Sequence, residues 1–395
     1  MSGCIAVINA GSSSIKFALF ALAIEGDVLY RGQIEGIGVS PHIKVKNKHG
    51  ETVEDRTWPA SGFDHNAATQ EILATGSRLA AGTPVRGIGH RVVHGGVSYD
   101  APIRLNRDVL EALSRLIPLA PLHQPHNLAP IRAIFDAVPH IPQVACFDTA
   151  FHRTQPNVAQ SFAIPRWLTD AGVRRYGFHG LSYEYLAGRM RELCPELGEG
   201  RVVIAHLGNG ASLCAVRGGL SVGSTMGFTA SDGLMMGTRC GALDPGVILH
   251  LMNEYRMEVA EVEDLIYRKS GLLGVSNLSS DMRTLRASCE PSAREAIELF
   301  VYRIIREVGS LTAALGGIDA LVFAGGIGEN DPATRAEVVE GCRWAGMALD
   351  SGRNAVGTGR ISTDSSKVAV WVIPTDEERL IARHTRHVLG KATAD

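Results

Sequence analysis

A strand–turn–strand pattern occurs twice in this sequence, roughly half a chain apart, and it constrains the fold more than any other feature. Residues 5–20 read as a strand, a small polar turn around Gly11, and a second strand; residues 202–216 repeat this order around Gly208 and Gly210. Duplication of one domain would produce such a repeat. Two similar hairpins can also arise by chance in an α/β protein, so both explanations stay open.

Short β-rich runs alternate with longer helical patterns along the chain. The strand-like runs that matter are residues 4–9, 85–93, 144–148, 202–207 and 320–324. The longest helical pattern covers residues 291–315, where apolar side chains recur with a period close to 3.6. We expect the last helix to begin near Thr375, with Thr375 as its N-cap and Glu378 closing a capping box. This alternation predicts an α/β fold, and 395 residues favour two domains.

Composition argues against several classes of partner. The formal net charge is -2 and the basic residues are scattered, so we expect no nucleic-acid partner. No apolar run is long enough to cross a bilayer, and the first residues lack the basic stretch of a signal peptide, so we expect no membrane partner. Seven dispersed cysteines without a Cys-x-x-Cys pair are typical of reduced thiols, which predicts a cytoplasmic location.

Three glycine-rich segments directly follow strand-like runs. They are residues 9–14 with Lys16 after them, residues 206–210, and residues 325–330. Small residues let backbone N–H groups approach phosphate oxygens, and hydroxyl groups add donors. None of the segments has the spacing of a Walker A loop, and a single Gly-Ser turn is more often only a turn. Together, three such turns favour a nucleotide site.

Four polar residues follow strands or stand in glycine-flanked loops: Arg91, Asp148, His179 and Arg239. An arginine fork binds carboxylate or phosphate, although a structural ion pair is an equal alternative for Arg91 taken alone. His90 and His94 have a spacing that binds zinc on a helix, but their valine and glycine neighbours predict a strand and a loop, so we expect no zinc site. The combination is what neutralises a transferring phosphoryl group.

With these motifs assembled, the sequence resembles the acetate kinase family over nearly its whole length. The similar segments are residues 9–16, 89–96, 120–123, 147–152, 175–182, 206–212, 226–229, 236–245, 271–283, 323–330 and 373–378. The resemblance implies an α/β fold of duplicated actin-like ATPase (ribonuclease H-like) domains, shared with sugar kinases, Hsp70 and actin. It implies an N-terminal domain of residues 1–148 with 380–395, and a C-terminal domain of residues 149–379 that carries the adenosine site and the interface of a homodimer.

The resemblance also implies reversible, ATP-dependent phosphorylation of acetate to acetyl phosphate by direct in-line transfer. It implies Mg²⁺, for which Mn²⁺ could substitute, near Asn9 and Glu377. A carboxylate at Glu377 is also favourable simply because it lies in the first turn of a helix. The nucleotide would be held by Lys16, His206, Leu207, Gly208, Asn209, Gly210, Asp281, Met282, Arg283, Gly326, Ile327, Gly328, Glu329 and Asn330, with Gly11, Ser12 and Ser14 as a phosphate loop.

The remaining roles concern the acid and the transferred group. Arg91 would bind the carboxylate, and the methyl pocket would be lined by Val93, Leu122, Phe178 and Ala230. His179 and Arg239 would stabilise the transition state, and the family treats Asp148 as a proton donor or acceptor. Because a short fatty acid is already ionised at neutral pH, we predict instead that Asp148 positions a neighbour.

Three departures from the family pattern concern the acyl site. Ala230 stands where the family has proline, Ala242 where it has aspartate, and Gly223 lies in a segment that replaces an aspartate. The smaller pocket wall at Ala230 keeps a propionate or butyrate kinase open as an alternative, since one methylene changes binding by only about 1–3 kcal/mol. A more remote alternative is an Hsp70- or actin-like ATPase, which has no use for Arg91, Arg239 and His179; a sugar kinase would lack carboxylate-binding arginines.

Overall fold

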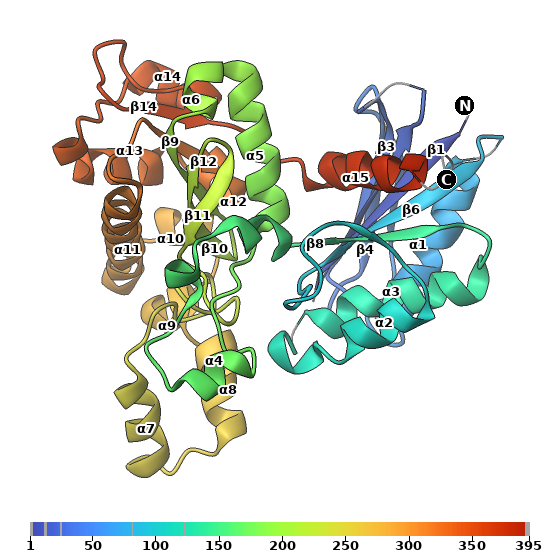
Figure 1. The fold of residues 1–395 in the computed structure, drawn as a ribbon, viewed down its shortest axis with the longest axis horizontal. Coiled ribbons are helices and arrows are strands. Elements are labelled where there is room, and N and C mark those ends of the chain that lie inside the picture. The colour runs from blue at the N-terminus through green and yellow to red at the C-terminus, as the bar shows by residue number, and fades with distance from the viewer. Residues whose placement is uncertain (1–2, 12–13, 24–25, 81, 122, 392–395) are drawn as a thin grey trace. The chain divides into compact units, whose positions relative to one another are not determined.

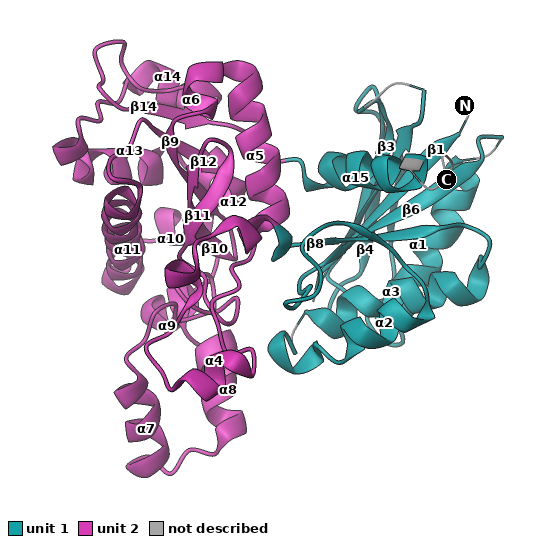
Figure 2. Cartoon of the chain, viewed as in Figure 1, with its two compact units in different colours: residues 1–150, 376–395 teal, residues 151–375 magenta. Residues whose placement is uncertain are grey.

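The computed structural model describes residues 3–11, 14–23, 26–80, 82–121 and 123–391. The chain divides into two compact units (Figure 1, Figure 2). Unit 1 is Met1–Ala150 with Asp376–Asp395, and unit 2 is Phe151–Thr375. In the described residues, no helix is both long and apolar enough to cross a membrane.

Unit 1 is built on an eight-stranded sheet with the order β5-β4-β3-β2-β1-β6-β8-β7. Its strands are β1 (Cys4–Ala10), β2 (Ile15–Ala21), β3 (Val28–Glu35), β4 (His42–Asn47), β5 (Thr52–Thr57), β6 (Val85–Val92), β7 (Ile103–Arg104) and β8 (Gln143–Phe147). β1 and β2 form an antiparallel hairpin, and β6 and β8 continue the sheet parallel to β1. β8 is buried along its whole length, as expected for a strand with helices on both faces.

Helices cover both faces of this sheet (Figure 1). α1 (His65–Leu79), α2 (Arg107–Ser114) and α3 (Gln124–Ala137) lie on one face, with the short 3₁₀ turn Ile117–Leu119 before α3, and α15 (Glu377–Lys391) lies on the other. A β-carbon on Gly89 of β6 would lie 2.2 Å from Thr385 Oγ1 and 2.6 Å from Ile381 Cγ2. Glycine at this position therefore allows α15 to pack directly on β6.

The sheet of unit 2 has the order β11-β10-β9-β12-β14-β13. Its strands are β9 (Arg201–Leu207), β10 (Ala211–Arg217), β11 (Leu220–Ser224), β12 (Ala320–Ala324), β13 (Gly359–Arg360) and β14 (Ala369–Val372). This order matches β3-β2-β1-β6-β8-β7 of unit 1 strand for strand, with the same parallel and antiparallel pairings. Chance similarity of two hairpins would not reproduce the whole order, so the predicted duplication is confirmed.

Unit 2 carries more helices than unit 1. They are α4 (Arg166–Asp170), α5 (Gly180–Leu193), α6 (Pro195–Gly198), α7 (Pro245–Asn253), α8 (Val259–Arg268), α9 (Gly271–Ser276), α10 (Met282–Ala287), α11 (Pro291–Leu315), α12 (Gly325–Asn330), α13 (Pro332–Gly341) and α14 (Ser351–Val356), with 3₁₀ turns at Ala150–Thr154, Asn157–Gln160 and Arg343–Ala345. α5 and α11 cover opposite faces of the sheet (Figure 1). α11 has the predicted bounds, and it ends at Gly316 in the left-handed conformation.

Two local predictions are wrong. Residues 325–330 were expected to form a turn, but they form the short helix α12, which follows β12 directly. At the start of α15, the backbone N–H of Arg379 donates to Asp376 Oδ1 at 3.0 Å, so Asp376 is the N-cap in place of Thr375. The hydroxyl of Thr375 is bonded to Ser182 Oγ at 2.8 Å.

Candidate active site

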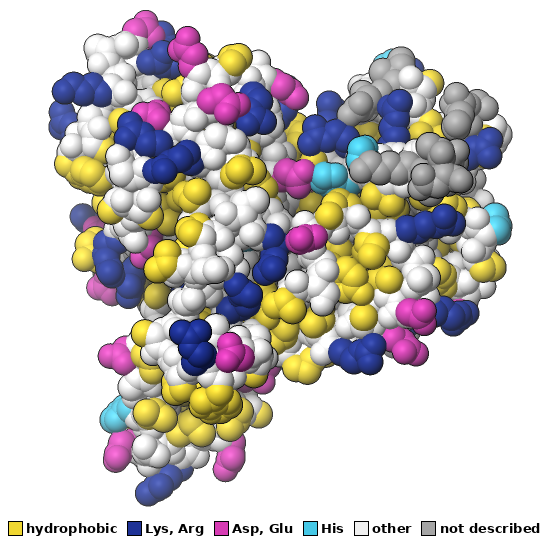
Figure 3. Space-filling model, viewed as in Figure 1, with side chains coloured by type: hydrophobic (Ala, Val, Ile, Leu, Met, Phe, Trp, Pro, Cys, Tyr) yellow, Lys and Arg dark blue, Asp and Glu magenta, His cyan; other side chains and the backbone are white. Residues whose placement is uncertain are grey.

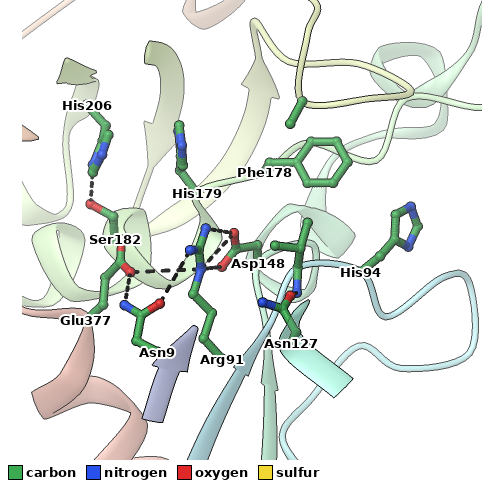
Figure 4. Close-up of polar contacts among 12 residues, drawn as sticks. Asn9, Arg91, His94, Asn127, Asp148, Phe178, His179, Ser182, His206 and Glu377 are labelled. Carbon is green, nitrogen blue, oxygen red and sulfur yellow. Dashed lines mark hydrogen bonds and ion pairs between the residues drawn. The ribbon is translucent and has the colours of Figure 1, made fainter. Parts of the chain in front are cut away.

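Arg91 and Asp148 form the centre of a polar cluster in unit 1 (Figure 4). They lie at the carboxyl ends of the neighbouring parallel strands β6 and β8. Arg91 Nε donates to Asp148 Oδ1 at 3.0 Å, and Arg91 Nη2 donates to Asp148 Oδ2 at 2.6 Å. Asp148 is 1% exposed. The carboxylate thus holds the guanidinium by a two-pronged, charge-assisted contact that fixes its orientation.

Asn9, Glu377 and Glu378 lie on the other side of Arg91. Asn9 Nδ2 donates to Glu377 Oε2 and to Glu378 Oε1 at 3.1 Å each, and Arg91 Nη1 donates weakly to Asn9 Oδ1 at 3.4 Å. Burial disfavours the charged form of Arg91, but the nearby carboxylates of Asp148, Glu377 and Glu378 raise its pKa above the usual value. Arg91 therefore stays a cation at any physiological pH.

The oxygen atoms around Asn9 suit a magnesium ion. Mg²⁺ prefers oxygen ligands and is usually bound by one or two carboxylates, waters and substrate phosphates. The amide group of Asn9 bonds to both Glu377 and Glu378, so two carboxylates lie close together and fit such an ion. In the described part of the chain, no three His, Cys, Asp or Glu side chains gather closely enough to hold a metal by themselves.

The loop after β6 is tied down by buried polar side chains. Val93, predicted to line the methyl pocket, is 3% exposed, and its N–H donates to Asn127 Oδ1 at 2.9 Å. Asn127 Nδ2 in turn donates to the carbonyl of Ala10 at 2.6 Å. On β6 itself, His90 bonds to Gln143 Oε1 at 2.8 Å, and burial lowers the pKa of His90 to about 4. His90 is thus a neutral structural histidine.

A second polar cluster lies in unit 2, around His179 and His206. The two imidazole rings stack with centroids 4.5 Å apart. His179 Nδ1 bonds to Ser212 Oγ at 2.8 Å, and His206 Nδ1 bonds to Ser182 Oγ at 2.8 Å (Figure 4 draws the second contact). His179 is the N-cap residue of α5 and has a φ of 58°, a conformation that costs a non-glycine residue roughly 1–2 kcal/mol. Strained residues of this kind tend to cluster at active sites.

Arg239 lies beside His179 at the turn between β9 and β10. A β-carbon on Gly210 would be 3.2 Å from Arg239 Nη2 and 3.3 Å from His179 Nε2, so both groups converge on this glycine. Arg239 Nη1 donates to the carbonyl of Ala230 at 2.5 Å. Ala230, predicted to line the acyl pocket, therefore also orients Arg239 through its backbone. Phe178, the last predicted wall residue in unit 2, is 1% exposed.

A cavity of about 810 Å³ lies within unit 2 next to the β9–β10 turn. Eight of the predicted nucleotide residues line it: Gly208, Asn209, Asp281, Met282, Arg283, Gly326, Ile327 and Asn330. Its size falls in the range of small-molecule sites. The side chain of Asp281 accepts a hydrogen bond from the backbone N–H of Arg283 and pairs with its guanidinium, which lowers the pKa of Asp281 to about 2.

Other predicted residues lie elsewhere. Leu207 and Gly328 are buried, His206 joins the stacked histidines, and Glu329 Oε1 accepts from the N–H groups of Gly325 and Thr375. Lys16 is exposed and pairs across the hairpin with Asn9, on the same face of the sheet. The N–H of Gly11 donates to the carbonyl of Ser14 at 2.7 Å. Ser12 and Leu122 lie outside the described residues.

Sequence reasoning missed several residues of these clusters. Ser280, Arg286 and Asp331 also line the cavity. Ser212 and Tyr183 stand behind His179, and Arg335 donates to the carbonyls of Gly328 and Glu329 at the end of α12. Only the match at residues 206–212 pointed toward Ser212; single serines, tyrosines and arginines at these spacings carry no signal of their own.

Comparison with known proteins gives a consistent result. The family model described as "Acetokinase family" matches residues 4–383. The chain belongs to the acetokinase family. An acetate kinase of Rhodopseudomonas palustris is 53% identical over 390 residues, covering 97% of this chain and 98% of the relative. One of Methylocella silvestris is 53% identical over 403 residues, covering 100% of both chains.

Two solved structures superpose over nearly the full chain. The acetate kinase of Porphyromonas gingivalis has a TM-score of 0.85 at 38% identity, and the propionate kinase of Francisella tularensis subsp. tularensis has 0.90 at 34%; each match covers 98% of this chain and 100% of the other. The duplicated actin-like ATPase fold predicted from the resemblance is therefore confirmed.

Proposed function

We propose that this protein is an acetate kinase, which transfers a phosphoryl group reversibly between ATP and the carboxylate of acetate. The observation that carries the proposal is the charged, Asp148-held fork of Arg91 in a chain 53% identical to acetate kinases. An arginine presented this way recognises a carboxylate by two parallel hydrogen bonds. We propose that the reaction takes place in the cytoplasm.

The roles of unit 1 follow from its polar cluster. Asp148 occupies the Nε–Nη2 edge of Arg91, so the acetate carboxylate would bind at the Nη1–Nη2 edge and replace the weak 3.4 Å contact from Nη1 to Asn9 Oδ1. Acetate is already ionised at neutral pH and needs no base, so Asp148 acts by holding Arg91 in place. Asn9 and Glu377 would hold Mg²⁺, or Mn²⁺ in its place, through their oxygen atoms. When bound, such an ion would supply positive charge that offsets the charge of the phosphates.

The roles of unit 2 follow from its cavity and its second polar cluster. The 810 Å³ cavity takes the adenosine, and the glycines at 208, 210 and 326 let the chain approach the phosphates. Phosphoryl transfer has a loose transition state with charge on the equatorial oxygens. Arg239 and His179, which converge at Gly210, stabilise that charge, and transfer proceeds directly in line without a phosphorylated residue.

One observation favours a second acid. The propionate kinase of Francisella tularensis superposes with a TM-score of 0.90, and Ala230 stands where the family usually has proline. A smaller wall admits one more methylene at little cost. We expect propionate to be phosphorylated as well, and Ala230→Pro to shift the preference toward acetate.

Trapping the acyl phosphate with hydroxylamine tests the function directly. The enzyme, ATP and Mg²⁺ are incubated with acetate, propionate or butyrate, and the acyl hydroxamate is measured. We expect the highest kcat/KM with acetate. The absence of product with all three acids contradicts the proposed function. With acetate as substrate, Arg239→Ala should lower kcat far more than it raises the KM.

A homodimer is proposed as well, formed through unit 2. Exposed apolar side chains gather around α7 and α8, including Val247, Leu249, Tyr255 and Val259, and yellow surface covers this region in Figure 3. A patch of this kind is typical of a protein interface. In sedimentation velocity, Leu249→Asp should give a monomer, while Val39→Asp, at an 81% exposed site of unit 1, should leave the dimer intact. A monomeric wild-type protein contradicts this proposal.

A further inference from the structure

A chain of two hydroxyl groups stands behind His179, on the side away from Gly210. Ser212 Oγ lies 2.8 Å from His179 Nδ1, and the hydroxyl of Tyr183 lies 2.5 Å from the same Ser212 Oγ. Tyr183 is on α5, one turn after His179, and Ser212 is on β10. Both side chains are fully buried. α5 and β10 therefore meet in a buried relay of two hydroxyl groups, which contacts His179 at Nδ1, the nitrogen away from Gly210.

The burial of this relay sets the direction of its hydrogen bonds. Among the described residues, Ser212 is the recorded hydrogen-bond partner of the Tyr183 hydroxyl. Burial raises the pKa of Tyr183 well above its usual value, so the hydroxyl keeps its proton. A buried O–H without an acceptor costs about 1–3 kcal/mol. Tyr183 therefore donates to Ser212, and Ser212 uses its own proton to donate to His179 Nδ1.

We propose that Tyr183 and Ser212 are positioning residues that hold His179 in the neutral form with its proton on Nε2. A histidine nitrogen that accepts a hydrogen bond leaves the ring proton on the other nitrogen. Nε2 is the atom that lies near Gly210, next to Arg239. The relay thus presents an N–H donor, aimed by packing, at the place where the proposed kinase reaction develops negative charge.

The neighbours of His179 explain why a neutral donor suits this place. Arg239 already supplies a fixed positive charge on the Nε2 side, and the ring of His206 stacks on its face. A charged imidazole would have to donate from Nδ1 to Ser212 Oγ. The hydroxyl proton of either Ser212 or Tyr183 would then have no acceptor within the relay. The relay therefore disfavours the imidazolium form, and Arg239 disfavours it further by like-charge repulsion.

Removing the relay hydroxyls tests this inference. Ser212→Ala should lower kcat about tenfold with small changes in the KM for acetate and ATP, and it should move the acid limb of the kcat–pH profile to higher pH. Tyr183→Phe should lower kcat by less. Because Tyr183 acts only through Ser212, the double variant should be no slower than Ser212→Ala. Tyr176→Phe is the matched control: it removes a hydroxyl that donates to the carbonyl of Gly172 in the same unit, and kcat should stay unchanged.

Two kinetic results overturn the proposal: a wild-type kcat in Ser212→Ala, or additive losses in the double variant. Nitrogen-15 NMR of histidine-labelled protein supplies a readout that needs no turnover, with His179→Gln to assign the signal. The wild type should show a protonated Nε2 and an unprotonated Nδ1, and Tyr183→Phe should weaken this preference. A wild-type Nδ1–H or an imidazolium at neutral pH also refutes the inference. Because the proposed kinase reaction is judged by the hydroxamate assay, failure of one proposal is distinguishable from failure of the other.

Discussion

Replacing Asp148 with asparagine separates positioning from proton transfer. The wild-type carboxylate accepts from Arg91 Nε at 3.0 Å and from Nη2 at 2.6 Å, and it is 1% exposed. Asparagine keeps the shape, but it offers one oxygen and turns an NH₂ group toward the guanidinium. Glu377 Oε2, only 4.0 Å from Arg91 Nε, would then compete for the freed cation.

The size of the effect follows from the burial of the pair. Breaking a fully buried ion pair by removing one partner costs about 3–5 kcal/mol. The side chain of Arg91 is 17% exposed, so solvent recovers part of this energy and about 2–3 kcal/mol is a fair expectation. If the loss falls on the binding of the carboxylate, kcat/KM for acetate should drop roughly 30- to 150-fold.

The measurement is kcat/KM for acetate across pH, by hydroxamate trapping. The matched control is Asp319→Asn, which alters another two-pronged arginine–aspartate pair, Arg201 with Asp319, at a half-exposed site of unit 2. It should leave kcat/KM unchanged and cost at most about 1 kcal/mol of stability. Loss of one limb of the pH profile in Asp148→Asn, or an unchanged kcat/KM, refutes the positioning role.

Three further predictions follow from single contacts. Gly210→Ala should lower kcat about tenfold, because its β-carbon would lie 3.2 Å from Arg239 Nη2. The control is Gly188→Ala on α5, where an added β-carbon would have no atom within 4 Å. This control should keep kcat and raise the free energy of unfolding in urea by about 0.5–1 kcal/mol. Arg335→Lys should raise the KM for ATP several-fold at nearly constant kcat, because lysine cannot reproduce the fork that bonds the last carbonyls of α12. An unchanged KM for ATP contradicts the role of Arg335 in supporting α12. Wild-type stability should fall as pH drops from about 6.5 toward 4, because the unfolded chain binds protons that buried His90 excludes. His90→Asn should remove on the order of 2 kcal/mol of that loss, and equal pH dependence of wild type and variant in urea unfolding contradicts this.

The strands were predictable from the sequence because they are short apolar runs that end in glycine or polar residues. Residues 320–324 form β12 as expected, and all five side chains are buried. α11 was equally readable, since its buried residues recur every three or four positions and Pro291 and Gly316 mark its ends. Local chemistry decides such elements, so a local pattern reveals them.

Particular side-chain contacts decided the features that were missed. Residues 325–330 look like a glycine turn, yet they form α12 because Glu329 Oε1 bonds the N–H of Gly325 and because Arg335 donates to the last carbonyls. At α15, Thr375 and Asp376 are both good N-cap residues, and the bond from Thr375 to Ser182, far away in the chain, leaves the cap to Asp376. No spacing rule contains these partners.

The two halves of the fold use equivalent strand ends for different chemistry. In unit 1, β6 carries Arg91 at its carboxyl end and the neighbouring β8 is followed by Asp148, so this half presents charged side chains. In unit 2, the equivalent β12 is followed by Gly325, where a β-carbon would lie 2.7 Å from the carbonyl oxygen of Leu207. No side chain fits there, so this strand end presents backbone, beside a cavity that Asp281, Arg283, Arg286 and Asp331 help to line. A guanidinium fork suits a small carboxylate and a bare backbone suits phosphates, so these strand ends support the proposal that Arg91 of unit 1 binds the acid and that the glycine segments of unit 2 approach the nucleotide.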